Sequence, residues 1–185
     1  MKATGIVRRI DDLGRVVIPK EIRRTMRIRE GDPLEIYTDR EGEVIFKKYS
    51  PIGELASFAS QYAETLYKTC SLSVVICDRD AVIACAGIPR KEYNDKRLST
   101  ELERVIEGRS LYVHRDSGEE LPVLAEGGSH FVSCAMPIIS EGDVIGCVAS
   151  VIDPNADARR DAPTADVESK LIQTAAGFLG RQLES

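Results

Sequence analysis

The sequence predicts an α+β fold in two parts, and three patterns support this prediction. Short β-branched runs separated by turn residues fill the first 50 residues. From residue 71 onward, longer apolar runs come in pairs joined by short polar turns, as antiparallel strands do. Two stretches with helical spacing flank these runs. We therefore expect a small β-rich domain over residues 1–50, a linker helix over 51–70, and an antiparallel sheet with flanking helices over 71–185.

The small N-terminal part is expected to form strand, turn, strand, helix and hairpin in that order. Asp11 to Gly14 reads as a turn, in which Gly14 can adopt a positive φ. Pro19 has the fixed φ that suits the first position of a helix. The predicted strands cover residues 5–10, 15–18, 34–38 and 43–48, and the predicted helix covers about 20–28.

This first part is too short to bury a sizeable core by itself. Along residues 5–10, Ile6, Arg8 and Ile10 share one face of the strand while Val7 and Arg9 share the other, so apolar and basic side chains mix on both. An intertwined homodimer would solve both problems, because strands of the partner would cover the apolar residues of each face. We therefore predict a homodimer through residues 1–50.

The larger part is expected to hold five strands, with helices before, between and after them. Ser50 is a candidate N-cap and Pro51 a first-turn residue for the helix that joins the two parts. The two flanking helices should pack on one face of the sheet, and with those of a second chain they could form a four-helix bundle. The predicted strands cover residues 72–77, 81–86, 111–114, 131–139 and 144–152, with helices over about 51–68 and 98–108 and near the C-terminus.

The charge is distributed unevenly along the chain. The net charge of the whole chain is −5, but residues 1–29 carry nine Lys and Arg against three Asp and Glu, a net charge of +6. Residues 51–185 have a net charge of −8. The ordinary interpretation of a charge run is a solvated face, but a basic head on an acidic body also fits a nucleic-acid-binding module joined to a second domain.

Arginines of the basic head are the candidate DNA-binding residues. Their guanidinium forks can bind phosphate oxygens or guanine edges in pairs. In the predicted helix, Arg23 and Arg27 would share one face, whereas Arg29 is expected only to solvate the helix end. A dimer would present each candidate twice, and about six to eight phosphate contacts would give a log–log salt slope of about −5 to −7. The candidates are Arg8, Arg15, Arg23 and Arg24.

Other classes of function find little support. No apolar run approaches the roughly 18 residues that span a bilayer, and the N-terminus lacks the apolar core of a signal peptide, so we expect a cytoplasmic protein without a membrane partner. The five cysteines are odd in number and form no C-x-x-C pair, which favours free, buried thiols over disulfides or a metal site. A redox role for one of them is the less favoured alternative.

Enzyme signatures are also weak, so we predict no catalytic residue, no metal ligand and no cofactor. His114 and His130 do not stand at a known metal-ligand spacing. Gly127 to Ser129 lacks the lysine and the following helix of a phosphate loop. Asp78 and Asp80 are interpreted as turn residues rather than as paired catalytic acids.

The motifs of residues 1–50 closely resemble the swapped-hairpin DNA-binding domain of the AbrB family of bacterial transition-state regulators. The resemblance implies an interleaved homodimer that inserts Arg8, Arg15, Arg23 and Arg24 into the grooves of DNA, with a preference for deformable A·T-rich promoter regions. The same fold also serves antitoxins, which usually carry a short toxin-binding tail. The matching motifs are residues 4–8, 11–19, 22–24, 31–37 and 46–49.

The second part resembles a GAF sensor domain in its late hairpin, residues 136–148, and in its order of elements. An AbrB-type head with a GAF-type tail resembles regulators of sporulation genes in spore-forming bacteria. That resemblance implies a tetrameric activator and repressor that acts in the forespore. Two hypotheses remain open for the tail: it binds an unknown small-molecule ligand, or it serves only to assemble dimers into tetramers.

Overall fold

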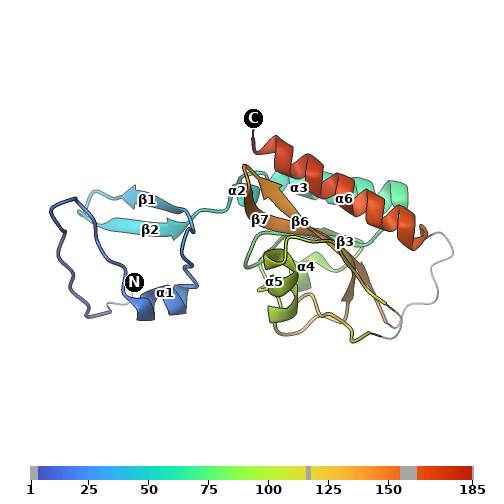
Figure 1. The fold of residues 1–185 in the computed structure, drawn as a ribbon, viewed down its shortest axis with the longest axis horizontal. Coiled ribbons are helices and arrows are strands. Elements are labelled where there is room, and N and C mark those ends of the chain that lie inside the picture. The colour runs from blue at the N-terminus through green and yellow to red at the C-terminus, as the bar shows by residue number, and fades with distance from the viewer. Residues whose placement is uncertain (1–3, 116–117, 155–161, 185) are drawn as a thin grey trace. The chain divides into compact units, whose positions relative to one another are not determined.

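The computed structural model describes residues 4–115, 118–154 and 162–184. The chain divides into two compact units, Met1–Tyr49 and Ser50–Ser185, and each is described by itself. Both units combine helices with antiparallel strands (Figure 1), so the predicted α+β class is confirmed.

The first unit contains a short helix and a two-stranded antiparallel sheet. Helix α1 spans Lys20–Met26, strand β1 spans Leu34–Thr38 and strand β2 spans Val44–Lys48. The hairpin loop between the strands is closed by Asp39, whose Oδ1 accepts hydrogen bonds from Glu41 N at 3.0 Å and from Glu43 N at 2.8 Å. The predictions of this hairpin and of a short helix that begins at Lys20 are confirmed.

The two strands predicted before α1, at residues 5–10 and 15–18, are not formed. Residues 4–19 contain only a turn, in which Asp11 N donates to Arg15 O and Gly14 N donates to Asp11 O, both at 3.0 Å. A strand needs a neighbouring backbone to satisfy its N–H and C=O groups. Within the described part of the chain no other segment pairs with these residues, although their composition favours strands.

The second unit opens with two helices where the sequence predicts one. Helix α2, Pro51–Glu54, and helix α3, Ala56–Cys70, are separated at Leu55. The predicted cap is confirmed, because Ser50 Oγ accepts a hydrogen bond from Gly53 N at 3.2 Å.

A five-stranded antiparallel sheet forms the centre of this unit, with the strand order β4-β3-β7-β6-β5. The strands are close to the predicted ranges, but a short helix, α4, occupies part of the predicted loop before α5. The strands are β3 Val74–Cys77, β4 Val82–Ala86, β5 Tyr112–Val113, β6 Phe131–Ser140 and β7 Asp143–Ile152, and the remaining helices are α4 Arg90–Tyr93, α5 Thr100–Glu107 and α6 Ala165–Gln182.

Both faces of this sheet are covered. Helices α3 and α6 contribute to one hydrophobic cluster with residues such as Ile76 and Val148, so the prediction that they share one face is confirmed (Figure 1). Helices α4 and α5 contribute to a second cluster, together with Val75 and Ala149. Successive residues of β3 therefore point into different clusters and all of them are buried, which explains why the strand is apolar throughout rather than alternating.

Helix α6 approaches the sheet closely at one glycine. A Cβ atom at Gly180 would collide with the carbonyl oxygen of Ile139 in β6, whereas a Cβ at Gly177, one turn earlier, would meet nothing. Glycine at position 180 therefore permits the packing distance between helix and strand. No helix in the described residues is long and apolar enough to cross a membrane.

We expect the two glycines of α6 to respond oppositely to the same substitution. Gly180→Ala should lower the free energy of unfolding by about 1–3 kcal/mol, because the backbone of β6 cannot yield without disturbing the sheet. Gly177→Ala should raise it by up to about 1 kcal/mol, because alanine favours the helix over the unfolded chain. Urea unfolding followed by circular dichroism measures both variants, and equal effects would contradict the close approach at Gly180.

Candidate nucleic-acid interface

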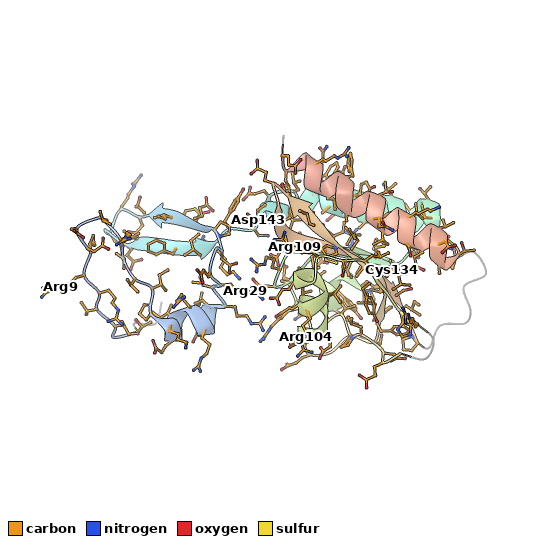
Figure 2. The ribbon with its side chains drawn as sticks, viewed as in Figure 1. Arg9, Arg29, Arg104, Arg109, Cys134 and Asp143 are labelled. Atoms are coloured by element: carbon orange, nitrogen blue, oxygen red, sulfur yellow. The ribbon has the colours of Figure 1, made fainter. Side chains whose placement is uncertain are left out.

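All four predicted DNA-binding arginines lie in the first unit and are exposed. Arg8 and Arg15 belong to the extended segment before α1, and Arg23 and Arg24 belong to α1 itself. The neighbouring Arg9, on the same segment, points away from the sheet of this unit (Figure 2). The structure therefore places these guanidinium groups on the surface of a small unit.

Asp11 holds the turn that carries Arg15. Its Oδ1 accepts hydrogen bonds from Leu13 N at 3.0 Å and Arg15 N at 2.7 Å, and its Oδ2 accepts one from Arg15 Nε at 2.8 Å. Gly14 completes the turn with φ +76°. The side chain of Arg15 is nevertheless 69% exposed. Its Nε is thus oriented by Asp11, while most of the guanidinium remains accessible to an anion.

These hydrogen bonds also shift the titration of Asp11. The bond from the backbone of Arg15 and, next, the bond from its side chain lower the pKa of the Asp11 carboxyl. The carboxylate that orients Arg15 is therefore ionised at neutral pH. The turn at residues 11–14 is predictable from the sequence, but the bonding of Asp11 to Arg15 goes beyond that prediction. Its signal is the Asp-x-Leu-Gly-Arg spacing, since aspartate often bonds the backbone two residues ahead.

Helix α1 ends sooner than predicted. Arg27 adopts a left-handed conformation with φ 54°, so it lies beyond the helix and is half-buried. It does not share a helical face with Arg23, and that expectation was wrong. Arg29 lies further beyond the helix end and is also half-buried, with its backbone N–H donating to Asp32 Oδ2 at 2.8 Å.

The carbonyl groups at this helix end belong to two of the candidate residues. Ile28 N donates to Arg23 O at 2.8 Å and Arg27 N donates to Arg24 O at 3.3 Å. This is the pattern of a Schellman motif, in which a left-handed residue turns the chain back over the last helical turn. The backbone of Arg23 and Arg24 is therefore fixed by the turn that follows them.

The described residues of the second unit include no candidate metal centre. No group of three His, Cys, Asp or Glu side chains that could hold a metal ion occurs in the described residues. The five cysteines are free, and four of them are buried. Burial raises the pKa of the Cys134 thiol to about 11, which disfavours the reactive thiolate (Figure 2 labels this residue).

The loop of Gly127 to Ser129 is engaged by a buried tyrosine. Tyr93 Oη accepts hydrogen bonds from Ser129 N and His130 N, both at 3.1 Å, and lies 2.9 Å from His130 Nδ1. The backbone donors of Ser129 and His130 are thus used within the protein. His114, the other histidine, packs its ring edge against Phe131, with 5.1 Å between the centroids.

Comparison with known proteins finds matching family models for both units. Residues 54–184 match the family model described as the stage V sporulation protein T C-terminal transcription factor, and residues 7–53 match that of the MazE bacterial antitoxin, described as antidote-toxin recognition. Stage V sporulation protein T of Bacillus subtilis is 52% identical over 184 residues, which cover all of this chain and 99% of the relative. The chain belongs to the stage V sporulation protein T family. The prediction of a sporulation transcription regulator is thereby confirmed.

The AbrB resemblance of the first unit is also confirmed. The transition state regulatory protein AbrB of Bacillus subtilis is 65% identical over 51 residues, which cover 28% of this chain and 52% of that protein. A solution structure of the N-terminal DNA recognition domain of Bacillus subtilis AbrB shares 65% identity, covers 28% of this chain and 94% of that one, and has a TM-score of 0.24.

The second unit of this stage V sporulation protein T family member also has a structural neighbour. The cofactor-binding GAF domain of the nutrient sensor CodY from Clostridium difficile covers 71% of this chain and 92% of that chain, with 14% identity and a TM-score of 0.41.

The arrangement around Asp11 can be tested by titration. We expect the Asp11 carboxyl to titrate below the ordinary aspartate value of about 3.9, because its ionised form accepts hydrogen bonds from Arg15. The stabilisation that the ionised Asp11 gives to the turn is present at neutral pH. It is lost as the pH falls through the lowered pKa. In Arg15→Ala the pKa should rise only part of the way, since the backbone donor remains. NMR titration of the carboxyl carbon measures both pKa values, and a value of about 3.9 or higher in the unsubstituted protein would contradict these hydrogen bonds.

Proposed function

We propose that this chain regulates sporulation genes, as activator and repressor, by binding double-stranded DNA at A·T-rich promoter regions through an intertwined N-terminal homodimer. The contacting residues are Arg8, Arg15, Arg23 and Arg24. The observation that carries the proposal is the exposure of all four arginines in one small unit that buries almost none of its own side chains. The family membership supports the same conclusion, because the Bacillus relative is a stage V sporulation protein and the matching family model is that of a transcription factor.

Exposed apolar side chains support the homodimer. Val7 is 84% exposed, Val17 is 70% exposed and Ile36 is 61% exposed. Exposed apolar residues that gather in one small unit, rather than lie scattered singly, mark an interaction surface. The segments that carry Val7 and Val17 also lack strand partners among the residues that the structure describes. A second copy would satisfy their backbone and side chains together.

The charge of the first unit supports DNA as the ligand. A dimer would bring four candidate arginines from each chain to a duplex, and each neutralised phosphate releases condensed counterions. The A·T preference would come from the groove width and deformability of such DNA rather than from a helix that reads base edges. We propose a cytoplasmic location in the forespore, as the resemblance to regulators of sporulation implies.

For the second unit we propose assembly of dimers into a tetramer, with binding of a small molecule as the alternative or additional role. Phe178 of α6 stacks on Tyr62 of α3, with 5.6 Å between the ring centroids, and yet it is 40% exposed. Two such helix pairs from different dimers could bury this aromatic surface in a four-helix bundle. Tetramers would double the DNA-binding heads and raise avidity for paired half-sites.

Salt-dependent DNA binding tests the main proposal. Full-length protein should bind a labelled A·T-rich duplex with an affinity that falls steeply with salt, and Arg15→Ala should weaken binding at least about tenfold, because one guanidinium is lost from each chain of the dimer. The measurement is fluorescence anisotropy at several salt concentrations. Arg104→Ala, which removes an exposed arginine from α5 of the second unit, is the charge-matched control and should bind as the unsubstituted protein does (Figure 2 labels Arg104).

Two outcomes would overturn the proposal. Weak, salt-insensitive binding by the unsubstituted protein would remove DNA as the ligand. Equal losses in Arg15→Ala and Arg104→Ala would show that total charge rather than the first unit governs binding.

The proposed tetramer makes a separate prediction. Phe178→Ala should convert tetramers to dimers in sedimentation velocity, because an apolar side chain at the proposed helix interface is truncated. Its far-UV circular dichroism should remain unchanged. A tetramer that persists in this variant, or an unsubstituted protein that sediments as a dimer, would leave ligand binding as the role of the second unit.

A further inference from the structure

Lys48, at the end of β2, contacts the end of the helix that carries Arg23 and Arg24. Its Nζ donates a hydrogen bond to Arg27 O at 2.9 Å and lies 3.5 Å from Asp32 Oδ2. The same Asp32 oxygen accepts the 2.8 Å hydrogen bond from Arg29 N. We call Asp32 and Lys48 the clamp, because together they fasten the residues that follow α1 to the hairpin.

The clamp is unusually protected from solvent for this unit. The side chain of Asp32 is 4% exposed and that of Lys48 is 26% exposed, whereas most side chains of the first unit lie open to water. A carboxylate that is nearly removed from water is stable only if it is paired and hydrogen-bonded. Removal of either side chain therefore leaves the charge of the other without its partner. The two residues act as one structural element rather than as two independent surface charges.

The clamp connects directly to the DNA-binding candidates through the Schellman motif. Arg23 O and Arg24 O are held by the N–H groups of Ile28 and Arg27, and Arg27 O in turn is held by Lys48. Helix α1 has only seven residues and buries none of its side chains, so its packing cannot fix its orientation. In the described part of the first unit, Lys48 provides a side-chain hydrogen bond from the hairpin to this helix end.

We propose that Asp32 and Lys48 are positioning residues that set the orientation of Arg23 and Arg24 toward DNA, without Asp32 touching DNA itself. The inference rests on the proposed DNA-binding function and adds to it two residues outside the arginine set. Asp32 orients Lys48, Lys48 holds the carbonyl group of Arg27, and the turn at Arg27 fixes the backbone of the two arginines.

Asp32 and Lys48 carry opposite charges, so their variants distinguish a positioning role from a simple charge effect. If only charge matters, Asp32→Ala tightens DNA binding by removing a negative charge, and Lys48→Met weakens it by removing a positive one. If the clamp positions the arginines, both variants weaken binding by about tenfold, the size expected when a charge-assisted hydrogen bond is lost. The double variant should then be about as weak as either single variant, because the residues act through one structure.

Matched controls exist on the same hairpin. Lys47→Met removes an equal charge from the preceding residue, whose Nζ lies over the Tyr37 ring, 4.4 Å from its centroid. Glu41→Ala removes an exposed carboxylate from the hairpin loop. Lys48→Arg keeps a cationic donor and should restore most of the affinity. Anisotropy with full-length protein, together with amide hydrogen exchange of Arg27 and Ile28, gives binding and helix-end order for each variant.

The expected result is weak binding and faster exchange of these amides in Asp32→Ala and Lys48→Met, with little change in Lys47→Met and Glu41→Ala. Asp32→Ala that binds as tightly as the unsubstituted protein, or more tightly, would overturn the positioning role. If a variant loses its circular dichroism signal, Asp32→Asn and Lys48→Gln provide milder tests with the same expected signs. If the unsubstituted protein fails to bind DNA in the same anisotropy measurement, the proposed function itself is rejected.

Discussion

The first unit cannot bury its own apolar side chains, and its unpaired segments and proposed dimerisation both follow from this constraint. Among its described residues only Pro19 is buried, while Val7 and Val17 are largely in water. Two segments with strand composition precede α1, and no described segment of this chain pairs with their backbone. An intertwined second copy is the proposed remedy, since it would supply apolar cover and strand partners at once.

Two carboxylates within this basic unit orient neighbouring cations. Asp11 bonds the backbone and side chain of Arg15, and Asp32 pairs with Lys48 at the end of α1. Each acid lowers the positive charge available for DNA, yet each restricts the conformations of a cation that would otherwise be mobile. Because an oriented guanidinium loses less conformational entropy on binding than a free one, the hydrogen bonds from Arg15 to Asp11 prepare Arg15 to bind an anion.

The second unit buries its apolar side chains within one chain. Its sheet is covered on both faces, and its buried cysteines act as small apolar residues in the two clusters. The close contact of Gly180 with β6 fixes α6 against the sheet, so the aromatic surface around Phe178 lies on a rigid support. A firm platform of this kind suits the proposed assembly, because a rigid surface loses little conformational entropy when it is buried.

The sequence by itself determined the α+β class, the hairpin, the Ser50 cap and the location of the four arginines, because these depend on turn residues, local periodicity and charge. It also carried the family resemblance, since dense motifs such as residues 11–19 survive in the order of the amino acids. The tertiary structure decided what depends on distant partners. The segments 5–10 and 15–18 are unpaired because strand formation needs a neighbour, Arg27 leaves the helix because the chain turns there, and Lys48 reaches Arg27 across 21 residues of sequence. Propensity describes one residue at a time, whereas these contacts exist only once the chain has folded.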